Sequence, residues 1–197
     1  MRVAILLATR PGATILDVGA GIGKFCIVAA ATLPCAHVRG VEHRPHFVAI
    51  ARDAAQRMGV DVDFAQGTLD GQDAASVDGI YLFNPFAENL SPAEDHLDES
   101  VQLNEERFWR DIESTERFLR AARVGTRVVT YCGWGGEMPP GYQLARRETR
   151  AGTIELWVKS AHAGVRATGE ARIGRATLGA LRERALLAGT ATVRDEQ

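Results

Sequence analysis

The sequence predicts an α/β fold in which a doubly wound, mostly parallel sheet of seven strands ends in an antiparallel hairpin. Short apolar runs bounded by glycine or proline alternate with longer amphipathic segments, and this alternation gives a parallel sheet covered by helices on both faces. Near the end of the chain, two strand-like runs follow one another without a helix between them, which indicates a hairpin. The 197 residues, 46% hydrophobic and 24% charged, suffice for one such domain with a sizeable core.

The first half of the chain alternates strands and helices. Thr14 to Val18 is an apolar run bounded by glycine, which is typical of a buried parallel strand. Pro34 ends the helix that follows, and Pro45 stands near the start of the next helix, where proline is favoured. We expect, in order, a short helix in residues 1–8, a strand at 14–18, a helix at 24–33, a strand at 37–41, a helix at 45–58, and strands at 62–65 and 80–83.

A charged stretch follows the fourth strand and contains two candidate helix starts. Ser91-Pro92-Ala93-Glu94 has the form of a capping box with proline at the first helical position. Asn104 is the stronger start, because Leu103 and Phe108 stand at the spacing of a hydrophobic staple. Apolar residues then recur at steps of three and four, which predicts one amphipathic helix at 105–122. The last strands are expected at 127–131, 142–147 and 153–159.

Two regions of different character divide the chain at about residue 160. Residues 1–160 carry all the expected strands and form the main domain. Residues 161–197 hold nine alanines and five glycines but no aromatic residue, so they have little to bury. We expect a mobile tail there, or a loosely docked helix at 176–187.

The composition excludes several classes of protein. The formal net charge of −2 gives no general attraction to nucleic acid or to anionic membranes. The apolar run at residues 1–8 is too short to span a bilayer and lacks the pattern of a signal peptide. Cys26, Cys35 and Cys132 have no metal-like spacing, and so sparse and odd a number fits reduced thiols. These features predict a cytoplasmic protein with no metal site.

A glycine-rich turn joins the first predicted strand to the first long helix. Residues Asp17 to Gly23 read Asp-Val-Gly-Ala-Gly-Ile-Gly. Glycines there let the backbone turn tightly and come close to a ligand. The free N–H groups at the start of the helix favour an anionic group, such as the carboxylate of an amino acid. Asp17, just before the turn, is placed to meet a cationic amine.

An acidic residue at the end of the next strand completes this pattern. Glu42 lies nineteen residues after Gly23 and can accept hydrogen bonds from the diol of a ribose. The dinucleotide fingerprint G-x-G-x-x-G needs its third glycine one residue later than Gly23. Asp17 also suits an ammonium group better than a pyrophosphate. The pattern of charges therefore favours S-adenosylmethionine over NAD.

These residues resemble the motifs of class I S-adenosylmethionine-dependent methyltransferases, over about residues 12–159. The segment Asp17 to Gly23 resembles the first motif of the family, and Val41-Glu42 resembles the acidic end of its second strand. Asn84-Pro85-Phe86 stands where the family carries its fourth-strand motif, beside the transferable methyl group. The resemblance implies a Rossmann-like fold, S-adenosylmethionine as cofactor, and methyl transfer to a nitrogen, oxygen or sulfur atom of an acceptor.

By this resemblance, the glycine loop would hold the methionine part of the cofactor, Glu42 the ribose and His43 the adenine. Gln66-Gly67-Thr68 would line the adenine edge. Many relatives have an aspartate directly after this glycine, where this chain has Thr68 and, two residues later, Asp70. The implied cofactor-binding residues are Asp17, Val18, Gly19, Ala20, Gly21, Gly23, Glu42, His43, Gly67, Thr68 and Asn84.

The resemblance makes Asn84, Pro85 and Phe86 the candidate catalytic residues, which would position the acceptor. Methyltransferases that act on exocyclic or amide nitrogens carry Asn-Pro-Pro-aromatic here, and this chain lacks the second proline. No residue stands out as a general base, so proximity and alignment would supply most of the catalysis. Two other functions are left open, a non-catalytic module that binds S-adenosylmethionine and an enzyme that binds NAD or another nucleotide.

The acceptor is expected to be a small molecule or a protein side chain. The stretch from Glu88 to Arg120 holds ten acidic residues and four arginines, a net charge of −6, and directly follows the acceptor strand. Such a stretch is typical of a solvated helix face, but as a lid it would repel phosphates and argue against nucleic acid. Few residues precede the first strand, which leaves open a homodimer or a partner chain that closes the site.

Overall fold

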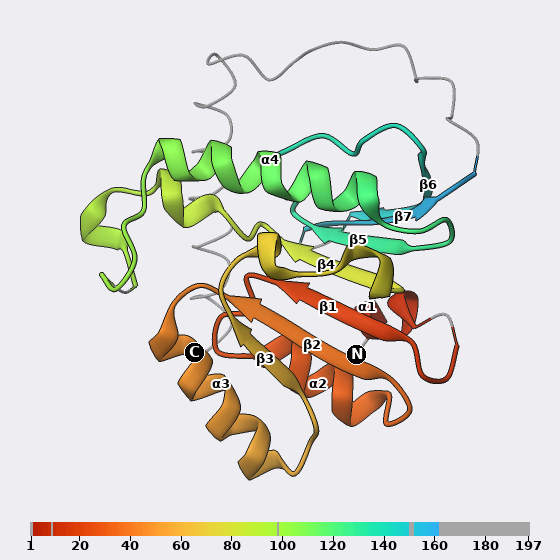
Figure 1. Cartoon of the computed structure of the whole chain (residues 1–197), viewed down its shortest axis with the longest axis horizontal. Helices are drawn as coiled ribbons and strands as arrows, with labels where there is room; N and C mark the ends of the chain where they lie inside the picture. The colour runs from red at the N-terminus through yellow and green to blue at the C-terminus, as the bar shows by residue number, and fades with distance from the viewer. Residues whose placement is uncertain (1, 9, 98, 150–151, 162–197) are drawn as a thin grey trace.

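The computed structural model describes residues 2–8, 10–97, 99–149 and 152–161, and these form one α/β unit around a seven-stranded sheet (Figure 1). The strand order is β3-β2-β1-β4-β5-β7-β6. The first five strands are mutually parallel, and β7 runs antiparallel to both β5 and β6. The predicted fold class is therefore confirmed. The strands are β1 (Thr14–Val18), β2 (His37–Glu42), β3 (Asp63–Gln66), β4 (Gly79–Phe83), β5 (Arg127–Tyr131), β6 (Tyr142–Thr149) and β7 (Thr153–Lys159).

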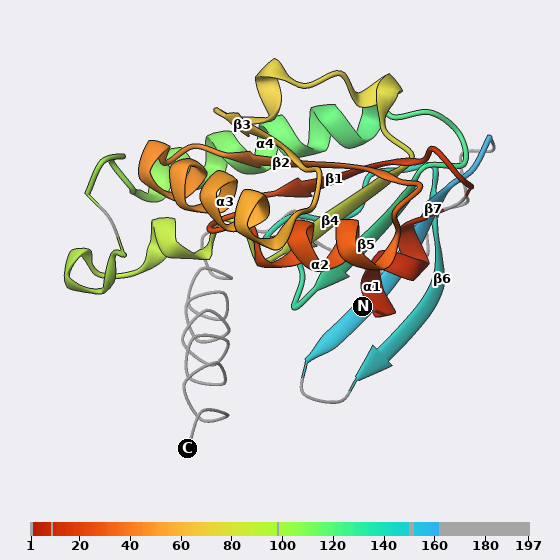
Figure 2. The same ribbon diagram turned by 90° about the horizontal axis from the view of Figure 1, so that it is seen from below.

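Helices cover both faces of the sheet, as Figure 2 shows in edge view. One face carries α1 (Arg2–Leu7), α2 (Lys24–Thr32) and α3 (Pro45–Met58). The other face carries α4 (Glu105–Ala121). The chain crosses from one face to the other between β3 and β4, where strand order reverses around β1. In open parallel sheets this reversal opens a crevice at the carboxyl ends of the strands, where ligands bind.

The alternation of side chains along β1 divides the core between the two faces. Leu16 and Val18 are buried in the cluster that includes Phe108 of α4. Ile15 is buried on the opposite face in a cluster with Leu7 of α1 and Tyr81 of β4. A strand that buries both faces must be apolar at nearly every position, which explains its continuous apolar run.

The helices begin and end close to where the sequence predicts, with one exception. Asn104 caps α4, because its side-chain oxygen accepts a hydrogen bond of 2.8 Å from the backbone N–H of Arg107. The capping box predicted at Ser91-Pro92-Ala93-Glu94 is wrong. Only a 3-10 turn, Ala93–Asp95, forms there, with Pro92 as its N-cap and no side-chain cap. None of its residues is buried, so the turn has no apolar face that would extend it into a helix.

The connection between β3 and β4 forms two 3-10 turns, Leu69–Gly71 and Ala74–Ser76. The tail predicted at residues 161–197, including the helix at 176–187, lies outside the described residues apart from residue 161. Among the helices that the structure describes, none is both long and apolar enough to cross a membrane.

Candidate functional site

The glycine loop after β1 adopts a backbone that other residues strongly disfavour. Gly19, Gly21 and Gly23 have φ values of 71°, 55° and 82°, all in the left-handed region. A Cβ atom on Gly19 would lie 2.9 Å from Cβ of Pro85, so the loop packs directly against the segment that follows β4. Glycine is therefore favoured at position 19 for two reasons, the left-handed backbone conformation and the close contact with Pro85.

The Glu42 carboxylate ties the glycine loop to the end of β2. Its side chain is 3% exposed. One oxygen accepts a hydrogen bond of 2.9 Å from the backbone N–H of Gly21, and the other accepts two from Arg44, through its backbone N–H at 3.0 Å and its Nε at 3.2 Å. A buried carboxylate needs such partners. The oxygen bonded to Gly21 keeps a lone pair for a further donor.

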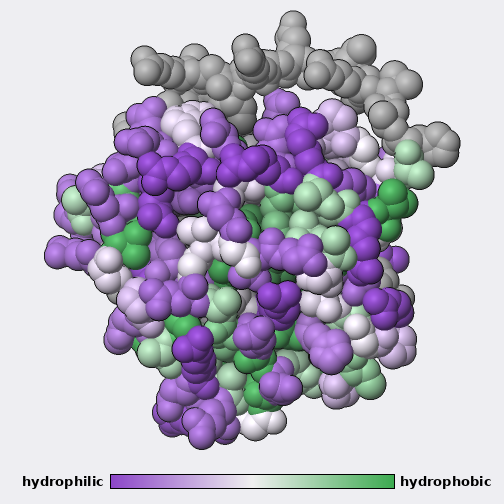
Figure 3. All heavy atoms as spheres, in the orientation of Figure 1, coloured by the Kyte–Doolittle hydropathy of each residue, from purple (hydrophilic) through white to green (hydrophobic). Residues whose placement is uncertain are grey.

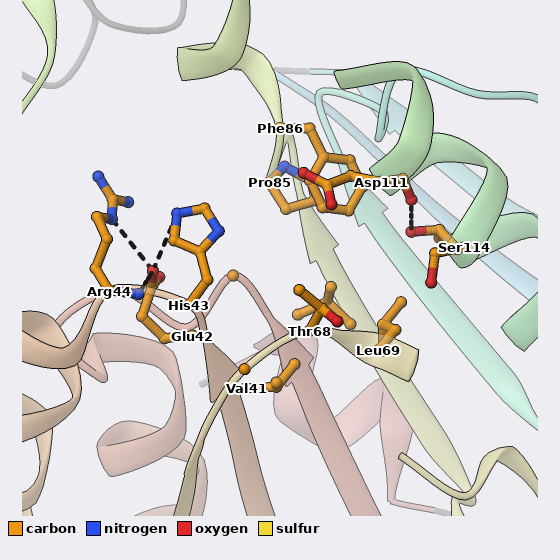
Figure 4. Close-up of a pocket in the computed structure, with 14 residues that line it drawn as sticks. Val41, Glu42, His43, Arg44, Thr68, Leu69, Pro85, Phe86, Asp111 and Ser114 are labelled. Atoms are coloured by element: carbon orange, nitrogen blue, oxygen red, sulfur yellow. Dashed lines mark hydrogen bonds and ion pairs between the residues drawn. The ribbon is translucent and has the colours of Figure 1, made fainter. Parts of the chain in front are cut away.

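A cavity opens beside Glu42 at the carboxyl ends of β1, β2 and β4. Figure 4 shows Glu42, His43 and Arg44 on one side, Pro85, Phe86 and Asp111 facing them, and Thr68 and Leu69 between. Its walls combine apolar surfaces with a few polar groups, which is typical of a small-molecule site. The lining residues are Val18, Gly19, Val41, Glu42, His43, Arg44, Gly67, Thr68, Leu69, Pro85, Phe86, Asp111, Ser114 and Thr115.

The cavity brings together most of the residues singled out in the sequence. Eight of the predicted residues line it: Val18, Gly19, Glu42, His43, Gly67, Thr68, Pro85 and Phe86. Five others do not line it: Asp17, Ala20, Gly21, Gly23 and Asn84. Gly21 still reaches the site through its hydrogen bond to Glu42.

Asp17 lies beneath the glycine loop, outside the cavity lining. Its side chain accepts a hydrogen bond of 3.4 Å from the Cys26 thiol of α2. Burial raises the pKa of Asp17 to about 7, the Cys26 hydrogen bond lowers it, and the nearby charge of Glu42 raises it further. Asp17 is therefore a carboxyl group that is about half protonated near neutral pH and sensitive to any cation placed beside it.

Asn84 directly follows β4 and has a left-handed backbone conformation. Its φ of 41° and that of Cys132, 57°, are the left-handed values among the described residues other than glycine. The backbone N–H of Asn84 donates a hydrogen bond of 3.0 Å to the carbonyl of Gly133, which joins the ends of β4 and β5. Unfavourable backbone geometry of this kind clusters at functional sites.

Helix α4 supplies a wall that the sequence analysis missed. Asp111, Ser114 and Thr115 line the cavity, and Asp111 is 9% exposed. Their spacing of three and four residues, in register with Phe108, was the available signal, because it places polar residues on the buried stripe of an amphipathic helix. The charge of residues 88–120 predicts a solvated helix face or a lid and does not single out these three residues.

Salt bridges and hydrogen bonds connect this wall to the end of β2. Arg44 donates to Glu88 at 2.8 Å, and Nη2 of Arg107 lies 3.1 Å from Nδ1 of His43. Burial lowers the pKa of His43, so its ring is neutral at pH 7. Histidine, cysteine and acidic side chains form no metal-like cluster among the described residues.

Comparisons with known proteins agree with this geometry. A family model described as a methyltransferase domain matches residues 15–103. A release factor glutamine methyltransferase of Geobacter sulfurreducens is 40% identical over 57 residues, which are 29% of this chain and 20% of that protein. The chain thus matches only about a fifth of the length of this relative.

Solved structures show the same fold. An RNA methyltransferase from Salinibacter ruber, in complex with S-adenosylhomocysteine, superposes with a TM-score of 0.61 at 22% identity, over 86% of this chain and 94% of that one. TrmN from Thermus thermophilus gives a TM-score of 0.56 at 21% identity, over 80% of this chain and 47% of that one. At such identities the likeness concerns the fold.

Proposed function

We propose that this chain is a class I, Rossmann-like S-adenosylmethionine-dependent methyltransferase that transfers a methyl group to a nitrogen, oxygen or sulfur atom of a small molecule or a protein side chain. The observation that carries the proposal is the cavity at the carboxyl ends of β1, β2 and β4. There a buried carboxylate, a left-handed glycine loop and apolar walls meet at the point where strand order reverses.

The lining of the cavity fits an adenosine group. The free lone pair of Glu42 would accept a hydrogen bond from the ribose diol. Val41 and Leu69 on one side, with Pro85 and Phe86 on the other, offer apolar surfaces to a flat ring. His43 and Thr68 would lie at the edge of the ring. The site thus provides one charged acceptor for the sugar and mostly apolar contacts for the base.

Asp17 would bind the ammonium group of the methionine part from beneath the glycine loop. A cation beside a buried carboxyl group favours its charged form, so binding would ionise Asp17. Glycines at positions 19, 21 and 23 place no side chains on the loop that follows Asp17.

Bound S-adenosylmethionine would supply an electrophilic methyl group, carried on a sulfonium, to the acceptor. The residues of this chain would position the acceptor relative to the methyl group. Asn84 and Phe86 follow β4, on either side of the Pro85 that packs against the glycine loop, where they would align the acceptor atom with the methyl group. Orientation of this kind supplies a large part of the barrier reduction in bimolecular reactions.

The negative charge of α4 and of the segment that leads to it favours an acceptor without phosphates. Hydrophilic side chains gather over α4 along the upper part of the face in Figure 3. Residues 88–120 carry the net charge of −6, and acidic surfaces repel the backbone of nucleic acids. A neutral or cationic amine is therefore the acceptor class we favour, and an RNA acceptor is the outcome that would correct it.

The test begins with binding and ends with transfer. S-adenosylhomocysteine should raise the melting temperature, since a ligand at a hundred times its dissociation constant stabilises by about 2.7 kcal/mol, whereas NAD should not. Radiolabelled S-adenosylmethionine is then incubated with separate pools of small amines, peptides and total tRNA. Stabilisation by NAD alone would identify a nucleotide enzyme. Binding of S-adenosylhomocysteine without transfer to any pool would identify a non-catalytic module.

A further inference from the structure

The Cys26 thiol lies in the first turn of α2, directly against the carboxyl group of Asp17. Cys26 is fully buried, and its Sγ donates a hydrogen bond of 3.4 Å to Oδ2 of Asp17. The other buried residue of α2 is Ala29, which has no polar side-chain group. The thiol is therefore the polar group that the buried side of this helix presents to β1.

A second acceptor lies within reach of the same thiol. Its Sγ is 3.8 Å from the backbone carbonyl oxygen of Arg39 in β2. A thiol has one proton, so it donates to one of these two oxygens at a time. An ionised Asp17 is the stronger acceptor, because hydrogen bonds to charged groups are stronger than those between neutral groups. Rotation about the Cβ–Sγ bond can turn the proton to the carbonyl oxygen when Asp17 is protonated, without moving the sulfur atom.

The titratable groups that face Asp17 come from α2, β2 and β4. Burial raises the pKa of Asp17, the hydrogen bond from Cys26 lowers it, and the charge of Glu42 raises it. Tyr81, the partner of Asp17 in β4, has a pKa that burial and the Asp17 charge raise, so its phenol stays neutral at pH 9. Burial and the same charge raise the pKa of the Cys26 thiol, which keeps its proton available for donation.

We propose that Cys26 is a positioning residue for the methyl donor, whose thiol holds Oδ2 of Asp17 and stabilises the carboxylate that would bind the ammonium group. This inference rests on the proposed function and adds a residue that acts through Asp17 and does not touch the ligand. With Oδ2 held by α2, Oδ1 is the oxygen left for the ammonium group. Because a thiol is a weak donor, Asp17 keeps a pKa of about 7, and a bound cation completes its ionisation.

The test measures the binding of S-adenosylhomocysteine at pH 7 and pH 9 by calorimetry, in the wild-type chain and in Cys26→Ala. Loss of the donor should raise the pKa of Asp17, so that more of the free protein is protonated at pH 7. Binding by the variant should then be about three- to tenfold weaker at pH 7 and equal to the wild type at pH 9, where Asp17 is ionised in both. Titration of the amino group of the ligand affects both proteins alike and cancels in the ratio.

Two further variants separate the donor from the packing of the side chain. Cys26→Ser keeps a donor, and a stronger one, so it should bind at pH 7 at least as tightly as the wild type. Cys35→Ala removes an exposed thiol and is the matched control, which should equal the wild type at both pH values. In an Asp17→Asn background, Cys26→Ala should cause no pH-dependent change, because the charge on which the thiol acts is gone.

The outcomes separate this inference from the proposed function. Absence of binding by the wild-type chain would refute the proposed function. Binding by the wild type, with a loss in Cys26→Ala that is the same at pH 7 and pH 9, would reduce Cys26 to a packing role and overturn the inference. Unchanged binding in Cys26→Ala would also overturn it. Should Cys26→Ala fail to fold by circular dichroism, Cys26→Val decides, since it fills the space without a donor and should show the same pH-dependent loss.

Discussion

At the scale of single residues, two carboxylates in similar depths of burial have different partners. Glu42 accepts three hydrogen bonds from the chain, one of them from the glycine loop. Asp17 accepts one, from a thiol, which is a weak donor. Burial raises the pKa of Asp17 and the thiol hydrogen bond only partly offsets it, so a bound cation would change the ionisation of Asp17.

Binding of S-adenosylhomocysteine should therefore release protons. With a pKa of about 7 in the free protein, Asp17 is half protonated at pH 7, and complete ionisation releases about half a proton per ligand bound. The dissociation constant should fall by up to about tenfold per pH unit as the pH rises toward 7 and level off above it. Calorimetry in two buffers of different ionisation enthalpy measures the proton count. Asp17→Asn should abolish it, and an unchanged count in that variant would contradict the role of Asp17.

Replacement of Glu42 tests the ribose contact. Glu42→Ala should weaken the binding of S-adenosylhomocysteine by about ten- to a hundredfold, the value of one or two charge-assisted hydrogen bonds. Asp63→Ala, at the start of β3 with a side chain that is 71% exposed, should leave the affinity unchanged. Equal affinities for both variants, measured by calorimetry, would exclude Glu42 from the ribose site.

At the scale of elements, the site is an assembly of strand ends held by close packing between loops. The glycine loop after β1 contacts the segment after β4 through Gly19 and Pro85. The end of β2 contacts the same segment through Arg44 and Glu88. Each loop is thus kept in place by a neighbour from another part of the sequence.

A methyl group added at Gly19 should disrupt this packing. Gly19→Ala faces both a left-handed φ and a contact of 2.9 Å with Pro85. Gly125→Ala is the matched control, because Gly125 has a φ of 89° but no atom within 4 Å of the added Cβ. In the control, the free energy of unfolding should fall by about 1–2 kcal/mol because of the backbone conformation alone, and in Gly19→Ala it should fall by more. Thermal unfolding gives the difference, and equal losses would show that the contact is relieved at no cost.

The bridge between Arg44 and Glu88 should govern the order of the segment after β4. Glu88 also accepts a hydrogen bond of 2.8 Å from the backbone N–H of Leu97, so it fastens residues 88–97 to the end of β2. Glu88→Gln should speed amide exchange in that segment by about tenfold, because half-buried ion pairs are worth more than exposed ones. Glu106→Gln breaks an exposed pair with Arg110 and should leave exchange unchanged. Equal exchange in both variants would contradict the bridging role.

At the scale of the whole molecule, the fold follows from local sequence patterns, and much of the site does not. The bounds of α3 and β5 match those predicted, since proline and apolar periodicity mark them clearly. The glycine loop and Glu42 were predictable because their spacing is fixed by one strand–helix–strand unit. Asp111 was not, because the residues of α4 that reach the cavity depend on how the helix docks on the sheet. The contacts of Arg44 with Glu88 and of Asn89 with Asp111 likewise join segments far apart in sequence.

The two walls of the cavity differ in origin. Residues 18 to 69 form one wall, and residues 85, 86 and 111 to 115 form the other. The match to known methyltransferase domains ends at residue 103, before α4 begins. The match therefore includes the first wall together with Pro85 and Phe86, whereas the residues that α4 contributes to the cavity lie beyond it. Substitutions on a single face of α4 can therefore reshape that side of the cavity without any change to the glycine loop or to Glu42.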